Sequence, residues 1–353
     1  MNEGMINKNG FSCPMPINNY EHILLAHGGG GRLSHSLIQE FFIEQFNNPS
    51  LNAQHDGAVF TIDGTKLAFT TDSYVVQPVF FPGGNIGELA VNGTINDLAM
   101  CGAKPIYISA GLIIEEGLLM EDLWKIVQSM KKAAESAGVQ IVTGDTKVVE
   151  HGKGDKIFIN TSGIGIIDNN IDISPQRCSV GDNIIINGRI AEHGIAILSA
   201  RENFEFVTKI QSDTVPLNGL VSDILKASKN IHVLRDPTRG GLSSSLNEIA
   251  VSSNTGIIIE ENKIPITEEV KGACEILGFD PLYIANEGKM LVFVPPEDTG
   301  KVLSAMLAHP LGRESAIVGK VIEENPGIVV MKTSLGSTRI VDMMTGEQLP
   351  RIC

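Results

Sequence analysis

Apolar residues recur along the first half of the chain at two spacings, one typical of helices and one typical of strands. The clearest helix is predicted over 123–137, where apolar residues repeat every three or four positions and Gly138 follows as a stop signal. An Asp63-Gly64 turn between two apolar runs predicts a hairpin. The elements predicted for this half are helices over 33–46, 87–102 and 123–137, two strands within 59–81, a buried strand over 139–142 that ends at Gly144-Asp145, and a strand over 156–167.

A cluster of Asn, Asp and Pro over 168–179 predicts a domain boundary, and beyond it strands and helices alternate again. We therefore predict a two-domain α/β (α+β) protein, with an N-terminal sheet domain over 21–172 and a C-terminal α/β domain over 173–344. Residues 1–20 are predicted to form a polar arm, and 345–353 a flexible tail. The elements predicted for the second half are strands over 183–187, 231–234, 289–294, 317–322 and 328–331, and helices over 219–227, 240–250, 267–277 and 298–308.

Composition mainly excludes certain partners and kinds of site. The 353 residues carry 27 Lys and Arg against 41 Asp and Glu, and the resulting net charge of −14 repels nucleic acid and anionic membranes. Apolar runs fall short of the roughly 20 residues that span a bilayer, and the N-terminus lacks a signal-peptide pattern. Five cysteines, odd in number and without a CxxC pair, indicate neither a disulfide framework nor a zinc site. We therefore expect a cytoplasmic protein that binds neither nucleic acid nor membrane.

Four consecutive glycines, Gly28 to Gly31, precede Arg32 at the predicted start of a helix. Such a run lets backbone N–H groups converge on an anion, and the helix dipole and Arg32 add positive potential. The run matches neither a Walker loop nor the GxGxxG pattern. A flexible hinge is the alternative interpretation, and the run alone does not decide between the two.

Aspartates stand beside turns or glycines at four places, namely Asp72, Asp97, Asp145 and Asp236. Three of them follow apolar strand patterns, from which a carboxylate can project into a crevice. Carboxylates of this kind hold Mg²⁺, which bridges nucleotide phosphates. Each one alone is more often a cap or turn residue, but four together modestly favour a metal–phosphate site.

The helix predicted over 87–102 is interrupted by Asn92, Gly93, Asn96 and Asp97. These residues are poor helix formers, and polar side chains that are buried need hydrogen-bond partners. Two interpretations remain open, a functional face and a satisfied structural network. The pattern slightly favours the functional face.

Basic residues and one glutamate stand close to these aspartates. Arg235, Arg239 and Gly240 surround Asp236, which favours phosphate binding over the alternative of an interdomain salt bridge. Lys147 could contact phosphate or move a proton. For Lys147 and Glu287, spacing alone favours ordinary solvated side chains.

Cys353 is a free thiol on the predicted tail. The nine residues from Thr345 could reach roughly 30 Å when extended, and Arg351 could favour the thiolate form. The thiol could therefore be modified and carried into a distant site. An unremarkable frayed end is the alternative.

Taken together, these motifs resemble the carbamoyl dehydratase (HypE) family of hydrogenase maturation factors. This family is similar to aminoimidazole ribonucleotide synthetase, selenophosphate synthetase and thiamine-monophosphate kinase, which form one ATP-binding superfamily. The aspartate motifs indicate only the superfamily, whereas GDTK and the terminal PRIC indicate the family. The strings that carry the resemblance between His22 and Cys353 are AHGGGGR, FTTDSYVV, FFPGGNIG, NGTINDLA, VTGDTKVV, RDPTRGG, ANEGK and PRIC.

The resemblance implies an aminoimidazole ribonucleotide synthetase-like fold, a homodimer and a reaction on the tail. A carbamoyltransferase, HypF, would place a carbamoyl group on Cys353. The carboxamide oxygen would then attack the γ-phosphate of ATP, and loss of phosphate would leave a protein thiocyanate. The HypC–HypD complex would accept the cyanide for the hydrogenase iron centre.

The resemblance also implies roles for individual residues, with ATP and Mg²⁺ as cofactors. Cys353 would carry the substrate, and Lys147 and Glu287 are candidates for deprotonating its nitrogen. The metal ligands would be Asp72, Asp97, Asp145 and Asp236. The ATP- and phosphate-binding residues would be Gly28, Gly29, Gly30, Gly31, Asn92, Thr146, Arg235, Arg239 and Gly240.

Two other functions fit the superfamily. One is an ATP-dependent kinase or synthetase that acts on a free small molecule, and this function leaves the terminal PRIC unexplained. The other is a non-catalytic scaffold that binds nucleotide and docks maturation proteins. ADP formation that depends on a carbamoylated Cys353 would separate the dehydratase from both.

Overall fold

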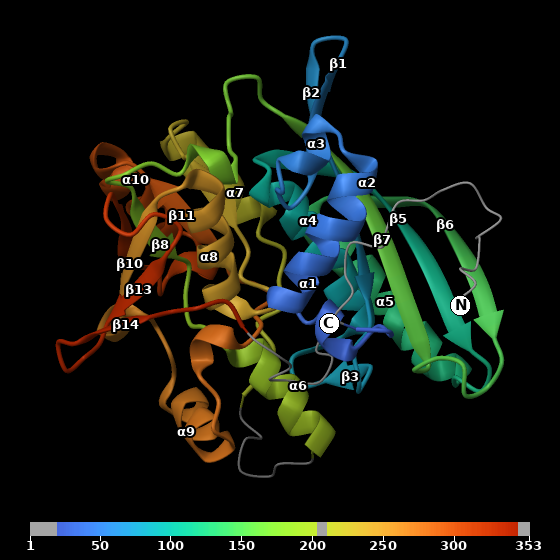
Figure 1. Cartoon of the computed structure of the whole chain (residues 1–353). Coiled ribbons are helices and arrows are strands. Elements are labelled where there is room, and N and C mark those ends of the chain that lie inside the picture. Colours follow the sequence, from blue (N-terminus) through green and yellow to red (C-terminus); the bar gives the residue numbers. More distant parts are fainter. Residues whose placement is uncertain (1–19, 203–209, 345–353) are drawn as a thin grey trace, which may run out of the picture.

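A computed structural model describes residues 20–202 and 210–344 and places a separate mixed sheet in each half of the chain. The N-terminal sheet has the strand order β1-β2-β7-β5-β6, and the C-terminal sheet has the order β14-β13-β10-β12-β8-β11-β9. Figure 1 shows them on opposite sides of the molecule, the first in blue to green and the second largely in orange and red. The predicted α/β (α+β) class is confirmed. The polar arm and the tail with Cys353 lie outside the described residues.

The N-terminal half follows the predicted pattern in most of its elements. Helix α5 ends where Gly138 adopts a left-handed conformation with φ of 69°, which is the stop that the sequence predicted. The helix predicted over 33–46 forms with a π-helical middle segment. The helices are η1 (Leu25–Gly28), α1 (Arg32–Leu37), η2 (Ile38–Ile43), α2 (Glu44–Phe46), α3 (Pro49–Asn52), α4 (Ile86–Met100) and α5 (Met120–Ala137). The strands are β1 (Ala58–Ile62), β2 (Thr65–Tyr74), β3 (Phe80–Phe81), β4 (Gly84–Asn85), β5 (Ala103–Glu115), β6 (Gln140–Val149) and β7 (Ile157–Ile167).

Helix α4 covers one face of the N-terminal sheet, where it contacts β2, β5 and β7. On β2 the residues facing α4, such as Ala68 and Tyr74, are buried, and the intervening ones are exposed. The opposite, helix-free face bears large apolar side chains that are about 44–45% exposed, namely Phe69, Tyr107, Ile113 and Ile166. The described residues of the single chain therefore leave an apolar sheet face without a covering helix.

The predicted strand over 139–142 is wrong in length and burial. Strand β6 runs over ten residues, Gln140–Val149, and nine of them are exposed. It is an edge strand, and its backbone pairs with β5 alone. The apolar run Val139–Val142 predicted burial, but none of the described strands lies outside β6.

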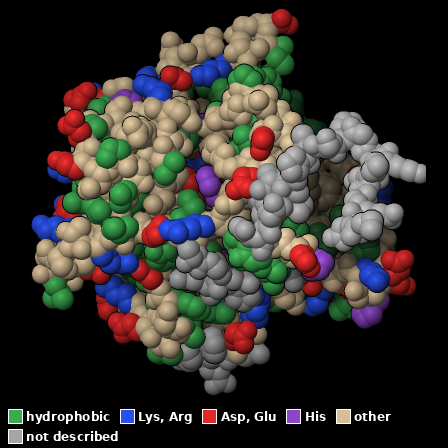
Figure 2. All heavy atoms as spheres, in the orientation of Figure 1, with side chains coloured by type: hydrophobic (Ala, Val, Ile, Leu, Met, Phe, Trp, Pro, Cys, Tyr) green, Lys and Arg blue, Asp and Glu red, His purple; other side chains and the backbone are tan. Residues whose placement is uncertain are grey.

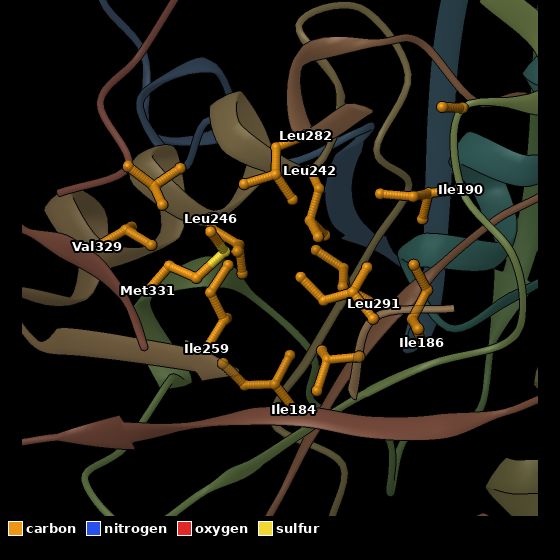
Figure 3. Close-up of a cluster of buried hydrophobic side chains, with 14 of the residues drawn as sticks. Ile184, Ile186, Ile190, Leu242, Leu246, Ile259, Leu282, Leu291, Val329 and Met331 are labelled. Carbon is orange, nitrogen blue, oxygen red and sulfur yellow. The ribbon is translucent and has the colours of Figure 1, made fainter. Parts of the chain in front are cut away.

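The C-terminal half packs its helices and sheet around a core of aliphatic side chains, several of which Figure 3 shows converging between strands and helices. The sequence patterns did not predict strand β5 of the N-terminal half, nor α6, β10 and β14 of the C-terminal half. Helix α6 is buried on most sides and therefore lacks an amphipathic period. The helices of the C-terminal half are η3 (Pro175–Arg177), α6 (Glu192–Glu202), α7 (Asn218–Ala227), α8 (Gly241–Ser253), η5 (Glu261–Lys263), α9 (Glu268–Leu277), η6 (Pro281–Tyr283), α10 (Pro296–Ala308) and η7 (Pro310–Gly312). Its strands are β8 (Asn183–Ile186), β9 (Val233–Arg235), β10 (Gly256–Glu260), β11 (Leu291–Val294), β12 (Ala316–Ile322), β13 (Val329–Lys332) and β14 (Thr338–Ile340).

On the face shown in Figure 2, Lys and Arg side chains are interspersed with Asp and Glu rather than gathered into a basic patch. Among the described residues, none of the helices has the length and apolar character needed to cross a bilayer.

Candidate active site between the two halves

A cavity of about 580 Å³ opens where the two halves meet. The N-terminal half contributes three carboxylates to its lining, Asp56, Asp72 and Asp97. The C-terminal half contributes Asp236 and Arg239. Three of the four aspartates that the sequence singled out therefore surround one space.

Different elements bring these carboxylates together. Asp72 lies inside β2, not at its end as the sequence predicted. It is two residues from both Thr70 and Tyr74, so it shares their face of the strand, which is the face toward α4. Asp97 projects from the last turns of α4, and Asp236 directly follows β9. The expectation of a strand-end position is thus correct for Asp236 and wrong for Asp72.

The carboxylates repel one another in a poorly solvated place. Burial, and then the charges of Asp236, Asp72 and Asp56, raise the pKa of Asp97 well above its usual value. Thr70 partly offsets this by donating a hydrogen bond to Asp97 Oδ2 at 2.8 Å. Burial and the charge of Asp56 raise the pKa of Asp236 to about 8, although Arg235 opposes the shift. A cation in the cavity would relieve this repulsion.

The residues present suit a magnesium ion that also binds phosphate. Their oxygens are hard ligands, and the buried Oδ2 of Asp56 has no hydrogen-bond partner. Over residues 20–202 and 210–344, no group of three or more His, Cys, Asp or Glu side chains is arranged to hold a metal ion. Magnesium commonly takes one or two protein carboxylates and completes its shell with phosphate oxygens and water, so the site fits the ion in the presence of a nucleotide.

Asp56 was missed by the sequence analysis, and its ion pair explains Arg235. The guanidinium of Arg235 lies 2.8 Å from Asp56 Oδ1 and also binds Glu248. Since Asp56 precedes β1 and Arg235 ends β9, this pair joins the two halves. The structure favours the interdomain salt bridge over the predicted phosphate contact for Arg235. The sequence did carry one signal for Asp56, because it stands in an Asp-Gly pair just before a strand.

The glycine run packs against the turn that carries Arg239. Gly30 has φ of 75°, and a methyl group added there would lie 2.7 Å from Arg239 Cβ. Gly240 also has φ of 75°, and an added methyl group would overlap Ser244 Oγ. Ser244 in turn donates to the carbonyl oxygen of Gly30 at 2.9 Å. The run is therefore a close-packed junction rather than an unattached hinge, although Gly28 and Gly29 are less crowded.

The last described residues lie against the same run. The backbone N–H of Arg32 donates to the carbonyl oxygen of Met344 at 2.9 Å, and its guanidinium pairs with Asp342. A methyl group added at Gly31 would overlap the Met344 carbonyl oxygen. Residues 345–353, including Cys353, lie outside the described residues, but the chain that leads to them begins beside the cavity.

The polar residues of α4 divide between two roles. Asn96 donates to the carbonyl oxygens of Val215 and Glu287, both at 3.1 Å, and accepts from the N–H of Leu217 at 2.8 Å. Asn92 is buried and donates to Thr214 Oγ1 at 3.4 Å. Neither lines the cavity. The hydrogen bonds of Asn96 are those of a satisfied structural network, and phosphate binding by Asn92 stays a prediction. Asp97 alone of this group faces the cavity.

Glu287 lies buried behind the carboxylate cluster. Burial, followed by the charges of Asp213, Asp236 and Asp72, raises its pKa well above the usual value. Its side chain is thus in electrostatic reach of the cavity, although the sequence spacing had suggested a solvated residue.

Asp145, Thr146 and Lys147 are not brought to the cavity within one chain. They lie on β6, which is three strands away from β2, or roughly 14 Å at normal strand spacing. Asp145 is in register with Gly111 of β5, Asn160 of β7 and Ser73 of β2, and it therefore faces the side of the sheet opposite to Asp72. Lys147 forms an exposed pair with Asp145 at 2.9 Å.

Known proteins resemble this chain over nearly its whole length. Residues 54–167 match the family described as AIR synthase related protein, N-terminal domain, and residues 179–332 match its C-terminal domain. The carbamoyl dehydratase HypE of Bradyrhizobium diazoefficiens is 51% identical over 93% of this chain and 95% of its own.

Two solved structures extend the likeness to three dimensions. A HypE–HypF complex contains a chain that is 48% identical, with a TM-score of 0.83 over 88% of this chain and all of that one. A hydrogenase maturation protein HypE in complex with ATP is 47% identical, with a TM-score of 0.79 over 94% of this chain and all of that one.

Proposed function

Because the chain belongs to the carbamoyl dehydratase HypE family, we propose that it uses ATP to dehydrate a carbamoyl group on Cys353 in hydrogenase maturation. The product is a thiocyanate on the same sulfur, which supplies cyanide for the hydrogenase iron centre.

The reaction balances in two steps. The carboxamide oxygen attacks the γ-phosphate of ATP, which releases ADP and leaves an O-phosphorylated imidate on the sulfur. Two protons leave the nitrogen in all, and the C–O bond breaks with loss of phosphate to form the C≡N bond. Phosphorylation is needed because an amide oxygen is a poor leaving group, whereas phosphate is a good one.

One observation carries the proposal, namely the hydrogen bond from Arg32 to the Met344 carbonyl. It anchors the start of the Cys353 segment beside the glycine run and Arg239, at the rim of the carboxylate cavity. The nine residues that follow could extend roughly 30 Å, which exceeds the span of such a cavity. A tail substrate could therefore reach it.

Our proposal places ATP at this cavity, with Asp72, Asp97 and Asp236 as its carboxylates and Asp56, which also lines the cavity, as a fourth. Mg²⁺ held by one or two of these carboxylates, together with phosphate oxygens and water, would neutralise charge on the transferring phosphoryl group. Arg239, half exposed and 3.7 Å from Asp72, is suited to bind a phosphate oxygen. The backbone N–H groups of the Gly28–Gly31 run would add neutral donors, and that of Gly30 would first have to leave Ser34 Oγ, to which it donates at 3.0 Å.

Glu287 and Lys147 are our candidates for removing the nitrogen protons, and they would have to come from different subunits. In one chain they are separated by the sheet, while β6 and the helix-free face are exposed and partly apolar. A homodimer that pairs these faces would bury Phe69 and Ile113 and could bring Lys147, Thr146 and Asp145 to the partner's cavity. Substituting Glu287 and Lys147 separately would test which of them removes each proton.

The partners follow from the reaction. HypF would supply the carbamoyl group, as the solved HypE–HypF complex suggests for this family. A HypC–HypD complex would accept the cyanide. The five scattered cysteines without a CxxC pair favour a cytoplasmic setting.

The proposal is tested by mass spectrometry of the C-terminal peptide. The full chain is incubated with HypF, carbamoyl phosphate and ATP, and the peptide is measured before and after a second addition of Mg²⁺ and ATP. We expect the carbamoylated Cys353 peptide to lose one water, with one ADP formed per thiocyanate. Equal ADP formation by Cys353→Ala would contradict the proposal and would favour a kinase or synthetase acting on a free metabolite.

A further inference from the structure

The chain from Asn286 to Met290 is held by buried side-chain amides. Asn286 Nδ2 donates to the carbonyl oxygen of Pro237 at 2.9 Å. Asn187 donates to the carbonyl oxygen of Gly288 at 3.1 Å and accepts from the N–H of Met290 at 2.8 Å. The backbone on both sides of Glu287 is thus fixed.

The backbone N–H of Glu287 is bound by a carboxylate, that of Asp213. The N–H donates to Asp213 Oδ1 at 3.0 Å, and the other oxygen of Asp213 lies 3.1 Å from Lys289 Nζ. The side chains of Asp213 and Lys289 are only 3% and 12% exposed. A methyl group added at Gly288 would overlap the Asp213 carbonyl oxygen, so the two strands of chain lie in close contact.

We propose that the Asp213–Lys289 ion pair is a positioning element, which sets the place of the Glu287 carboxyl group for proton removal. The proposal rests on the role suggested above for Glu287. Neither residue lines the cavity, and they act through the backbone of Glu287 and through charge.

The charges of Asp213 and Lys289 explain why an ion pair, rather than a lone aspartate, stands beside Glu287. Burial alone would raise the pKa of Asp213, but the positive charge of Lys289 keeps it below its usual value. Asp213 can therefore stay ionised and accept strongly from the Glu287 N–H. Without Lys289, a second uncompensated negative charge would lie beside the buried Glu287, where like charges already disfavour ionisation.

The test compares four variants in single turnover on the carbamoylated full chain, with thiocyanate formation and ATP affinity measured separately. Asp213→Ala is expected to slow thiocyanate formation by about tenfold to a hundredfold, because misplacement of a catalytic group by 1 Å can cost that much. ATP affinity should stay within about twofold, since neither residue contacts the cavity. The double variant Asp213→Asn, Lys289→Met keeps the acceptor for the Glu287 N–H without any charge, and it should recover the rate to within about threefold.

Two further variants separate positioning from loss of stability. Asp182 forms a comparably buried pair with His232, at 2.8 Å and 2% exposure, away from the cavity lining. Asp182→Ala should lower the unfolding midpoint like Asp213→Ala but leave the rate unchanged. Glu287→Gln reports on the underlying role and should slow the reaction by at least about a hundredfold.

Three results would overturn the proposal. The first is a normal rate for Asp213→Ala while Glu287→Gln is slow, which would refute positioning and leave the role of Glu287 intact. The second is a double variant as slow as Asp213→Ala. The third is a normal rate for Glu287→Gln, which would remove the role of Glu287 itself and with it the need for a positioning pair.

Discussion

The backbone N–H of Arg32 and the carbonyl oxygen of Met344 are joined by a hydrogen bond of 2.9 Å, although the first residue lies near the start of the described chain and the second is its last described residue. This contact places the start of the Cys353 segment against the glycine run. Since Gly30 also packs against Arg239, the segment that ends at Met344, the glycine run and the lining of the carboxylate cavity share one junction.

Gly31→Ala tests that junction. An added methyl group would overlap the Met344 carbonyl oxygen, so it should displace the start of the tail and slow thiocyanate formation by roughly tenfold or more. Gly272→Ala on α9, where a methyl group meets no atom within 4 Å, is the control and should behave as wild type. Wild-type turnover by Gly31→Ala, measured by mass spectrometry of the C-terminal peptide, would argue against a tail fixed at Met344.

Substitutions of the two arginines near Asp236 should affect different properties, stability for Arg235 and ATP binding for Arg239. Arg235→Met leaves the buried Asp56 without its partner and should lower the free energy of unfolding by roughly 3 kcal/mol. Arg239→Met should leave stability nearly unchanged but weaken ATP binding by about tenfold, the typical value of one charge-assisted hydrogen bond. Urea unfolding and calorimetric titration measure the two effects, and the reverse assignment would show that Arg235 is the phosphate ligand.

Asn96→Ala should be among the most destabilising changes on α4. It leaves two carbonyl oxygens and one N–H, from Val215, Glu287 and Leu217, without their partner between the domains. We expect a loss of roughly 2–5 kcal/mol in the free energy of unfolding, because buried polar groups would lose their hydrogen bonds. Asn170→Ala on the exposed linker is the control, with an expected change within about 0.5 kcal/mol. A small effect at Asn96 would mean that water replaces the amide.

Mixing two inactive variants tests the shared site. Lys147→Met and Glu287→Gln should each be inactive alone, whereas a mixture refolded or exchanged together should recover about one quarter of wild-type activity. Half of randomly paired dimers are mixed, and each mixed dimer has one intact site of two. Recovery would support contributions from two subunits, while no recovery despite proven exchange would place both residues in the same chain's site.

The described cysteines should resist alkylation in the native protein. Cys101, Cys178 and Cys274 are buried, and burial raises the pKa of Cys178 and of Cys274 to about 11. Iodoacetamide at pH 8 should therefore label these three peptides only after unfolding. Because the folded-state pKa is raised, the associated stability is fully present below the unfolded pKa of about 8.5 and is lost as pH rises toward 11. Native labelling at the rate of an unfolded peptide would contradict this burial.

Elements with a strong period were predictable, and those shaped by their neighbours were not. The amphipathic pattern of α5 and its stop at Gly138 identified that helix. Strand β6 was predicted to be short and buried, because an apolar run carries no information on whether another strand covers it. Helix α6 was missed since it is enclosed on most sides.

The same distinction applies to the site. Asp72, Asp97 and Asp236 were recognisable from their turns and motifs, whereas Asp56 was not, because its role depends on Arg235 of the other half. Asn96 looked functional in sequence because a polar residue on an apolar helix has two explanations. Its three interdomain hydrogen bonds decide for the structural one.

By itself, the sequence determined the mixed fold class, the acidic surface, the membership of the motifs in one ATP-binding superfamily and the presence of a thiol on the C-terminal segment. Local period and residue type are enough for these properties. Only the tertiary structure decided that three carboxylates converge with Asp56, that Arg235 is bound elsewhere, and that Lys147 lies on the opposite face of the sheet. Those facts depend on which distant segments pack together, and packing is set by the burial of whole surfaces rather than by any one motif.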